Sequence, residues 1–344
     1  MKNKFFALFC GVILLVGCSK KGNELGTSLE VVDYAGRTVK LEKPAERIVV
    51  MADNSLVIVK QLGAINSVIA LDSKTKGYLP LSIINETNPE LISLPDVGKT
   101  KNPNYEYIIS LAPDLILFKG NQESSDMLEE KTGVPVACII SQGEYDFDIY
   151  TVIGKLLGKE QKAKEVISVL TGQMESIKKT LSSLQEDQKK SAYIVVQNSK
   201  NNLFKTQRNS LSLDLASVNN VCATTSNVDE WGFAEVNKEE FLRLNPEIIF
   251  LDSPSGNSSI TKDEIYENDT FQFADAVKNQ NVFHTHTFSL PKDYVYVVAE
   301  AFYYAHTAYP EIMTESIYSQ AINEIFEVTY GIKAYYESWK KTLH

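Results

Sequence analysis

Short apolar runs alternate with amphipathic stretches along the first part of the chain, and this alternation predicts strands separated by helices. Apolar runs bounded by glycine, proline or polar clusters are typical of buried strands. The predicted strands are residues 47–51, 67–71, 115–118 and 134–140. The predicted helices are 105–111, 127–132 and one that ends at Gly63, and residues 29–41 predict a hairpin turning at Ala35-Gly36. This order predicts a parallel α/β sheet.

The pattern changes from about residue 148, where apolar residues recur at helical spacing through residue 184 with no strand among them. Alternation then resumes. The predicted strands are 192–196, 248–251 and 282–284, and the predicted helices are 210–218, 238–244 and most of the chain from 294 onward. The aromatic side chains of this last region are expected in the helix core. The fold class is therefore α/β, with two parallel-sheet lobes joined by one long linking helix.

The two lobes share an internal repeat. The sequence EYIISLAPDLILF, starting at Glu106, aligns without gaps with EEFLRLNPEIIFL, starting at Glu239. Each segment predicts a helix, a proline-terminated turn and a core strand, because proline disfavours helix in the residue before it. One such unit is common in α/β proteins. Two in register indicate that the lobes are built alike.

The N-terminus has the form of an export signal. Lys2 and Lys4 precede an apolar run that is too short to span a bilayer and closes with LVGC at Cys18. This tetrapeptide resembles the bacterial lipobox, in which the cysteine is lipidated. The alternative is a short buried helix with a chance cysteine. The expected divisions are a signal peptide (1–17), a lipidated tether (18–28), an N-terminal lobe (29–143), a linking helical segment (144–188) and a C-terminal lobe (189–344).

Composition narrows the class of function. The formal net charge of -10 argues against nucleic acid, whose phosphates require clustered Lys and Arg. Cys138 and Cys222 lie far apart in the sequence, so two buried free thiols are expected and not a disulfide. The run Gly98-Lys99-Thr100 mimics the end of a P-loop, but position 93, where the motif needs glycine, is Ser93.

Several segments in order resemble the substrate-binding proteins of bacterial ABC importers for cobalamin, ferric siderophores and haem. The segments that carry this resemblance are 32–49, 95–117, 153–160 and 276–279, together with the lipobox. The resemblance implies two Rossmann-like lobes bridged by a rigid helix, with the ligand in a cleft between them. It implies a monomeric binding protein without catalysis or cofactor.

The resemblance also implies one permease-docking glutamate on each lobe, and the matching positions are Glu106 and Glu239. The partners would be the permease and ATPase subunits of the importer. A simpler explanation exists, because each glutamate follows an Asn (Asn104, Asn237) and falls in the first turn of a predicted helix. A carboxylate there gains about 0.3–1 kcal/mol from the helix dipole.

Candidate ligand contacts follow from topology, because ligands of open α/β sheets sit beyond the carboxyl ends of the strands. The candidates are polar residues that follow predicted strands or lie on polar loops able to face inward. They are Asp53, Asn54, Lys99, Lys101, Lys119, Gln122, Gln197, Lys205, Arg208 and Trp231. Cations mixed with amides suit an anionic chelate, since Lys and Arg recognise carboxylates and oxyanions.

His284 and His286 are two residues apart, so on a strand they would share one face. Such a pair could bind a metal, or His286 could contact a ligand such as haem. Ordinary loop histidines are the favoured interpretation.

The leading hypothesis is a lipid-anchored solute-binding protein that captures a ferric siderophore, haem or cobalamin. Within the same fold the alternative ligand is molybdate or tungstate. The rival classes are a lipid-anchored metal-dependent enzyme built on the two histidines and a surface adhesin.

Overall fold

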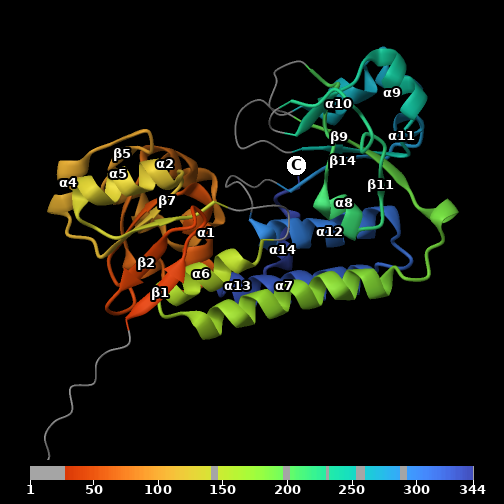
Figure 1. Cartoon of the computed structure of the whole chain (residues 1–344). Coiled ribbons are helices and arrows are strands. Elements are labelled where there is room, and N and C mark those ends of the chain that lie inside the picture. The colour runs from red at the N-terminus through yellow and green to blue at the C-terminus, as the bar shows by residue number, and fades with distance from the viewer. Residues whose placement is uncertain are drawn as a thin grey trace, which may run out of the picture.

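The computed structural model describes residues 28–140, 146–196, 202–229, 232–252, 260–286 and 293–343. These residues form two α/β lobes above a layer of long helices (Figure 1). In the described part of the chain, none of the helices combines the length and apolarity needed to cross a bilayer.

The N-terminal lobe is built on a four-stranded parallel sheet with the order β4-β3-β7-β8. Its strands are β3 (Ile48–Met51), β4 (Val68–Leu71), β7 (Leu115–Phe118) and β8 (Val136–Cys138). The helices of this lobe are α1 (Asp53–Gln61), α2 (Ser73–Tyr78), α3 (Ile83–Thr87), α4 (Tyr105–Ser110) and α5 (Gln122–Thr132). Two small antiparallel pairs complete it, β1 (Leu29–Val32) with β2 (Thr38–Leu41) and β5 (Gly98–Lys99) with β6 (Asn102–Pro103).

The C-terminal lobe repeats this plan with the order β11-β9-β13-β14. Its parallel strands are β9 (Ser191–Val195), β11 (Asn219–Asn220), β13 (Ile248–Leu251) and β14 (Val282–His284). A separate two-stranded antiparallel sheet pairs β10 (Lys205–Gln207) with β12 (Phe233–Glu235). The shorter helices are α8 (Leu211–Leu215), α9 (Lys238–Leu244), α10 (Lys262–Tyr266) and α11 (Asp275–Lys278). In both sheets the strand that comes first in the chain (β3 or β9) has the next one (β4 or β11) on one side, at the edge of the sheet. The last two strands in the chain (β7 and β8, or β13 and β14) lie on its other side.

The internal repeat extends to the backbone. Ala112 and Asn245 occupy equivalent positions after α4 and α9, and both have positive φ (47° and 39°). Each directly precedes the proline that the two repeat segments share. The acid after that proline also plays one role twice. Asp114 accepts the backbone N–H of Arg47 at 3.0 Å, and Glu247 accepts that of Ser191 at 3.0 Å. Each carboxylate therefore fixes the start of the neighbouring parallel strand, and the repeat expected from the sequence is confirmed.

Long helices form the base on which the lobes stand. They are α6 (Asp148–Leu156), α7 (Glu160–Thr180), α12 (Tyr294–Ala308), α13 (Glu315–Tyr330) and the short α14 (Tyr336–Lys340). The linking segment contains the long helix α7 and the shorter α6, which are separated at Gly158, where φ is 63°. A Cβ at Gly158 would lie 3.0 Å from Pro44, so the close packing there also favours glycine.

The connection between the lobes is wider than a single helix. Helix α13 packs against both α7 and α1, and one hydrophobic cluster continues from the N-terminal lobe into the C-terminal helices. Gln61 of α1 donates to Asp293 and to the Tyr330 hydroxyl, both at 2.9 Å, and accepts from the Tyr150 hydroxyl at 2.6 Å. All four residues of this junction network are buried. The lobes are therefore joined by a shared core with satisfied polar groups.

Candidate functional site

A basic hollow lies at the carboxyl edge of the N-terminal sheet. It has a volume of about 400 Å³ and is lined by Ser73, Lys74, Lys99, Thr100 and Lys101. Lys99 and Lys101 are exposed and form no ion pair with any residue that the structure describes. The wall of the hollow is mainly hydrocarbon, and the ammonium groups of these two lysines are not engaged by a described acid.

Local hydrogen bonds shape this hollow. Asp72 caps α2 by accepting the Thr75 N–H at 3.1 Å, and it accepts the Thr100 hydroxyl at 3.0 Å. Gly98 has φ of 90°, and a Cβ there would lie 3.0 Å from the Asn102 carbonyl, so the tight β5–β6 turn requires glycine. The turn holds Lys99 and Lys101 beside the first turn of α2.

Asp53 lies beside this hollow, at the start of α1, and binds two lysines: Lys74, which lines the hollow, and Lys119. Lys74 Nζ lies 2.8 Å from one of its carboxylate oxygens and Lys119 Nζ lies 3.3 Å from the other. Burial acts to raise the pKa of Asp53, but the hydrogen bond from Lys74 and the charge of Lys119 outweigh it, so the pKa lies below its usual value. Asp53 is therefore an anion that orients two half-exposed lysines.

Asn54 follows Asp53 and is buried. Its side-chain oxygen has no hydrogen-bond partner among the described residues. The structure thus brings five of the predicted contacts to one edge, namely Asp53, Asn54, Lys99, Lys101 and Lys119. Lys74 was missed, although its place three residues after a predicted strand at 67–71 was the available signal.

The carboxyl edge of the C-terminal sheet has different chemistry. Asp252 follows β13, and burial raises its pKa to about 6, against a hydrogen bond from Thr285 that lowers it. Burial and the charge of Asp252 raise the pKa of Glu300, on α12, to about 8. Sequence reasoning missed both acids, because only packing of α12 on the sheet brings them together.

The other predicted contacts lie elsewhere or are already engaged. Gln122 lines a separate hollow on α5 with Glu123, Asp126, Met127 and Glu130. Lys205 pairs with Asp229 at 3.0 Å, and exposed Arg208 donates to the Ala223 carbonyl at 3.2 Å. Gln197, Trp231 and the predicted lipidation site Cys18 lie outside the described residues.

The two histidines do not form a metal site with other described residues. Strand β14 ends at His284, and the ring of His286 stacks on Trp339 with centroids 3.5 Å apart. The ring nitrogens of His286 lie 2.6 Å from the Thr342 hydroxyl and 3.3 Å from that of Tyr318. Burial lowers its pKa well below the usual value. Within the described ranges, no group of three or more His, Cys, Asp or Glu side chains could hold a metal ion.

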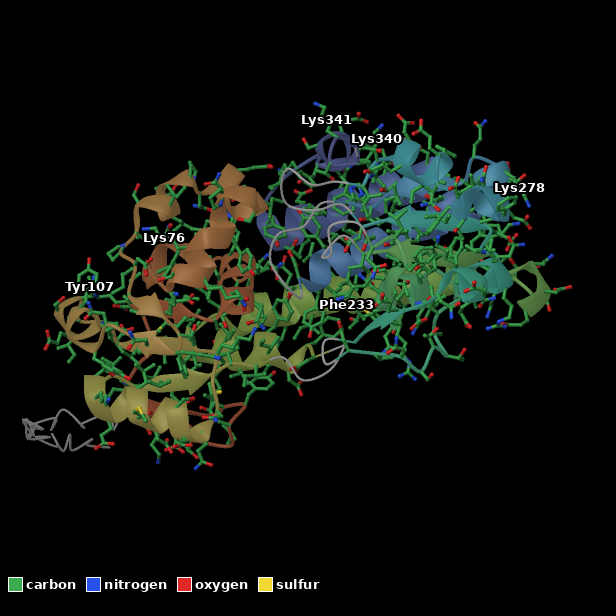
Figure 2. All side chains as sticks on the ribbon, turned by 90° about the horizontal axis from the view of Figure 1, so that it is seen from above. Lys76, Tyr107, Phe233, Lys278, Lys340 and Lys341 are labelled. Carbon is green, nitrogen blue, oxygen red and sulfur yellow. The ribbon has the colours of Figure 1, made fainter. Side chains whose placement is uncertain are left out.

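Glu106 and Glu239 are exposed on α4 and α9, at the far ends of the two lobes and distant from α7 (Figure 1). Figure 2 shows the neighbouring Tyr107 at the outer end of the N-terminal lobe. The expected caps are present, since Asn104 accepts the Tyr107 N–H at 3.1 Å and Asn237 accepts the Glu240 N–H at 2.7 Å. Cys138 and Cys222 are free and buried, as predicted.

A fold of two parallel α/β lobes on a helical base, with polar groups at the carboxyl edges, defines a solute-binding protein. The family model for periplasmic binding proteins matches residues 48–287. The chain belongs to this family, in the class with a helical backbone between the lobes. It is thus a substrate-binding component of an ABC transporter, and proteins of this family are non-enzymatic.

Individual relatives agree with this assignment. The chain is 26% identical over 286 residues to the Fe(3+)-citrate-binding protein YfmC of Bacillus subtilis, covering 80% of this chain and 86% of YfmC. It is 26% identical over 300 residues to the petrobactin-binding protein YclQ of the same organism, covering 81% and 90%. A periplasmic solute binding protein from Veillonella parvula superposes with a TM-score of 0.72 at 20% identity, covering 88% of this chain and 93% of that structure.

Proposed function

We propose that this chain is a lipid-anchored, monomeric binding protein that captures an anionic ferric chelate between its lobes and delivers it to an ABC permease. The observation that supports this ligand class is the lysine-lined hollow of the N-terminal lobe. Exposed Lys99 and Lys101 lie beside Lys74, and Lys74 and Lys119 share the single carboxylate of Asp53. Asp72 and Asp96 accept hydrogen bonds from Thr100 and Ser73 of the hollow, so four lysines lie near three carboxylates and positive charge is in slight excess.

Topology and chemistry favour the same location. Ligands of open α/β sheets bind beyond the carboxyl ends of the strands, where these lysines lie. Carboxylates and catecholates of an iron chelate accept charge-assisted hydrogen bonds from ammonium groups. Two relatives bind ferric citrate and petrobactin according to their names. Haem and cobalamin lack such support, and molybdate serves as an alternative to be tested.

Delivery would use the two exposed glutamates. Glu106 and Glu239 lie on different lobes, so a permease with one cationic side chain for each would hold both lobes at once. The stiff base of α7 and α13 keeps the spacing between the glutamates nearly constant, which limits the entropy lost on docking.

The test is calorimetric titration of the unlipidated mature protein with ferric citrate, ferric petrobactin, haem, cobalamin and molybdate. Substitution of Lys99→Gln together with Lys101→Gln should weaken binding of the chelate about 10- to 100-fold, or about 1.4–2.8 kcal/mol. The matched control is Lys164→Gln with Lys178→Gln, which removes two exposed charges of α7 that form no ion pair with any described residue and should leave affinity unchanged.

Binding of molybdate alone, or equal effects of both double variants, would contradict the proposed ligand. The anchor is tested separately by Cys18→Ala, which should move the protein from the membrane fraction to the soluble fraction of cells. Retention of the variant on membranes would exclude lipidation at Cys18 as the anchor.

A further inference from the structure

Two exposed aliphatic side chains occupy the same position of the internal repeat. Ile109 on α4 is 49% exposed and Leu242 on α9 is 42% exposed. Each lies three residues after its lobe's exposed glutamate, so in each helix the aliphatic side chain and the carboxylate share one face.

The glutamates beside them are unlike the other acids of the repeat. Glu240 pairs with Arg243 at 2.8 Å, and Asp114 and Glu247 bind backbone N–H groups. Glu106 and Glu239 form no ion pair with any residue in the described ranges. Two equivalent surfaces therefore each present a carboxylate without a cationic partner next to exposed hydrocarbon.

Repetition is what makes these residues informative, because a single exposed leucine on a protein surface is ordinary. The preceding residues, Ile108 and Phe241, are both fully buried, and the following leucines of the two helices are both half-buried. The helices thus lie on their lobes in the same rotation, although most of their side chains differ. The exposed position is nevertheless occupied by an aliphatic residue in both helices.

We propose that Ile109 and Leu242 are apolar anchors of the permease contact, each entering an apolar hollow next to the cation that binds Glu106 or Glu239. This inference rests on the proposed docking function and adds to it the chemistry of the partner surface. The partner is the membrane-embedded part of the importer, which presents two such sites at a separation set by the length of this molecule.

Charge favours this occupant over others. A second copy of the chain has a net charge of -10 and attracts Glu106 and Glu239 only weakly. Its α4 carries no basic residue, and on its α9 Arg243 already pairs with Glu240, which leaves Lys238. An anionic lipid surface would repel both glutamates. A permease surface with arginine or lysine beside hydrocarbon satisfies both kinds of group, and an aliphatic anchor in a pocket with a polar rim is one form that a binding interface takes.

Hollows beside each helix give the partner surface further points of contact. One of about 690 Å³ is lined in part by Glu239, Glu240 and Arg243. Another of about 600 Å³ lies on α5, which packs against α4, and includes exposed Met127.

The experiment is site-specific photocrosslinking of the full-length, membrane-attached protein in cells that express its importer. The photoreactive residue p-benzoylphenylalanine is placed at Ile109 or Leu242, and crosslinked partners are identified by peptide mass spectrometry. Controls carry it at Ile92 and Phe273, which are 44% and 58% exposed and lie outside the repeat. Reference positions are Tyr107 and Lys238, adjacent to the glutamates.

We expect Ile109 and Leu242 to crosslink to a multi-spanning importer subunit severalfold more than the controls. Ile109→Ser with Leu242→Ser should weaken binding to importer-containing membranes about tenfold or more, with unchanged affinity for ferric citrate. Crosslinks at the reference positions alone, or crosslinks of Ile109 and Leu242 to lipid or a second copy, would overturn the inference while the docking function stands. Absence of importer crosslinks at all four docking positions would overturn both.

Discussion

The carboxyl edges of the two lobes have the same topology and opposite electrostatic behaviour. In the N-terminal lobe, lysines hold Asp53 as an anion with a lowered pKa. In the C-terminal lobe, burial raises the pKa of Asp252 to about 6 and that of Glu300 to about 8. The repeated strand order therefore determines where a site can form, while the residues at the edge determine which charge it presents. A duplicated framework can offer unlike surfaces to the two sides of one ligand.

The cores behind these edges also differ. In the N-terminal lobe Ile108 packs into an aliphatic cluster with Val49, Met51 and Ile116. Its equivalent, Phe241, stacks on Phe271 with ring centroids 4.0 Å apart and meets other aromatic rings edge-on. The same helix is thus fixed to its sheet by different side chains.

The largest expected effect on stability comes from removing the contact between Phe241 and Phe271. Phe241→Ala should destabilise the C-terminal lobe by about 3–5 kcal/mol, while Ile108→Ala should cost the N-terminal lobe about 2–5 kcal/mol. We expect Phe241→Ala to exceed Ile108→Ala, because more area is removed. Amide hydrogen exchange in β13 and β7 measures each lobe separately. Leu242→Ala, at an exposed position, is the control and should change stability by less than about 0.5 kcal/mol. An equal or larger effect of Ile108→Ala would contradict the comparison.

A smaller effect is expected on how the stability of the folded protein changes with pH. The pKa of Glu300 is about 8 in the folded protein and about 4.3 when unfolded. Its protonated form therefore contributes stability that is fully present below about pH 4.3 and is lost as pH rises through 8. Glu300→Gln should leave Tm nearly unchanged at pH 4 and raise it at pH 8, by about 2–4 °C for each kcal/mol recovered.

Asp53 gives the opposite sign and serves as the matched comparison. Because its pKa is lowered in the folded protein, its contribution is present at neutral pH and disappears as pH falls below the usual aspartate range. Asp53→Asn should therefore lower Tm at pH 7 and matter less in acid. The same pH profile for both variants, followed by differential scanning calorimetry, would show that the two edges do not differ as described.

The smallest expected effect on stability comes from substitutions in the turns that follow α4 and α9. Ala112 and Asn245 share a left-handed backbone, which costs a residue other than glycine about 1–2 kcal/mol. Ala112→Gly should stabilise by up to about 1 kcal/mol. Asn245→Gly should destabilise, because it removes the 2.9 Å hydrogen bonds between Asn245 and Asp275. Thermal unfolding measures both, and stabilisation by Asn245→Gly would exclude a role for those bonds.

Much of the fold followed from local pattern. The helix predicted at 238–244 matches α9, and the repeat that starts at Glu106 and Glu239 is present in backbone and strand order. The separation of α6 from α7 at Gly158 was not predicted, because the apolar spacing on either side stays in phase with a helix. The antiparallel pair of β10 and β12 was also missed, since its strands are three residues long and far apart in sequence.

The site was less predictable, for a physical reason. Lys119 follows a predicted strand and could be placed at the sheet edge by topology, while Lys99 and Lys101 were selected from the loop before Glu106 and lie at the same edge. Burial cannot be inferred in this way. His286 looks like a ligand in sequence and is instead enclosed against Trp339. Glu300 looks like an ordinary helix residue, yet its side-chain oxygen Oε1 is buried.

The Gln61 network has a consequence for protein engineering. Because Gln61 of the first lobe bonds to Asp293 and Tyr330 near the end of the chain, the polypeptide cannot be divided into two exchangeable modules at the linking helix. A chimera that takes its first lobe from one family member and its second from another would place unmatched polar groups in a buried junction. A design that recombines ligand specificity should therefore keep Gln61, Asp293 and Tyr330 matched across the junction.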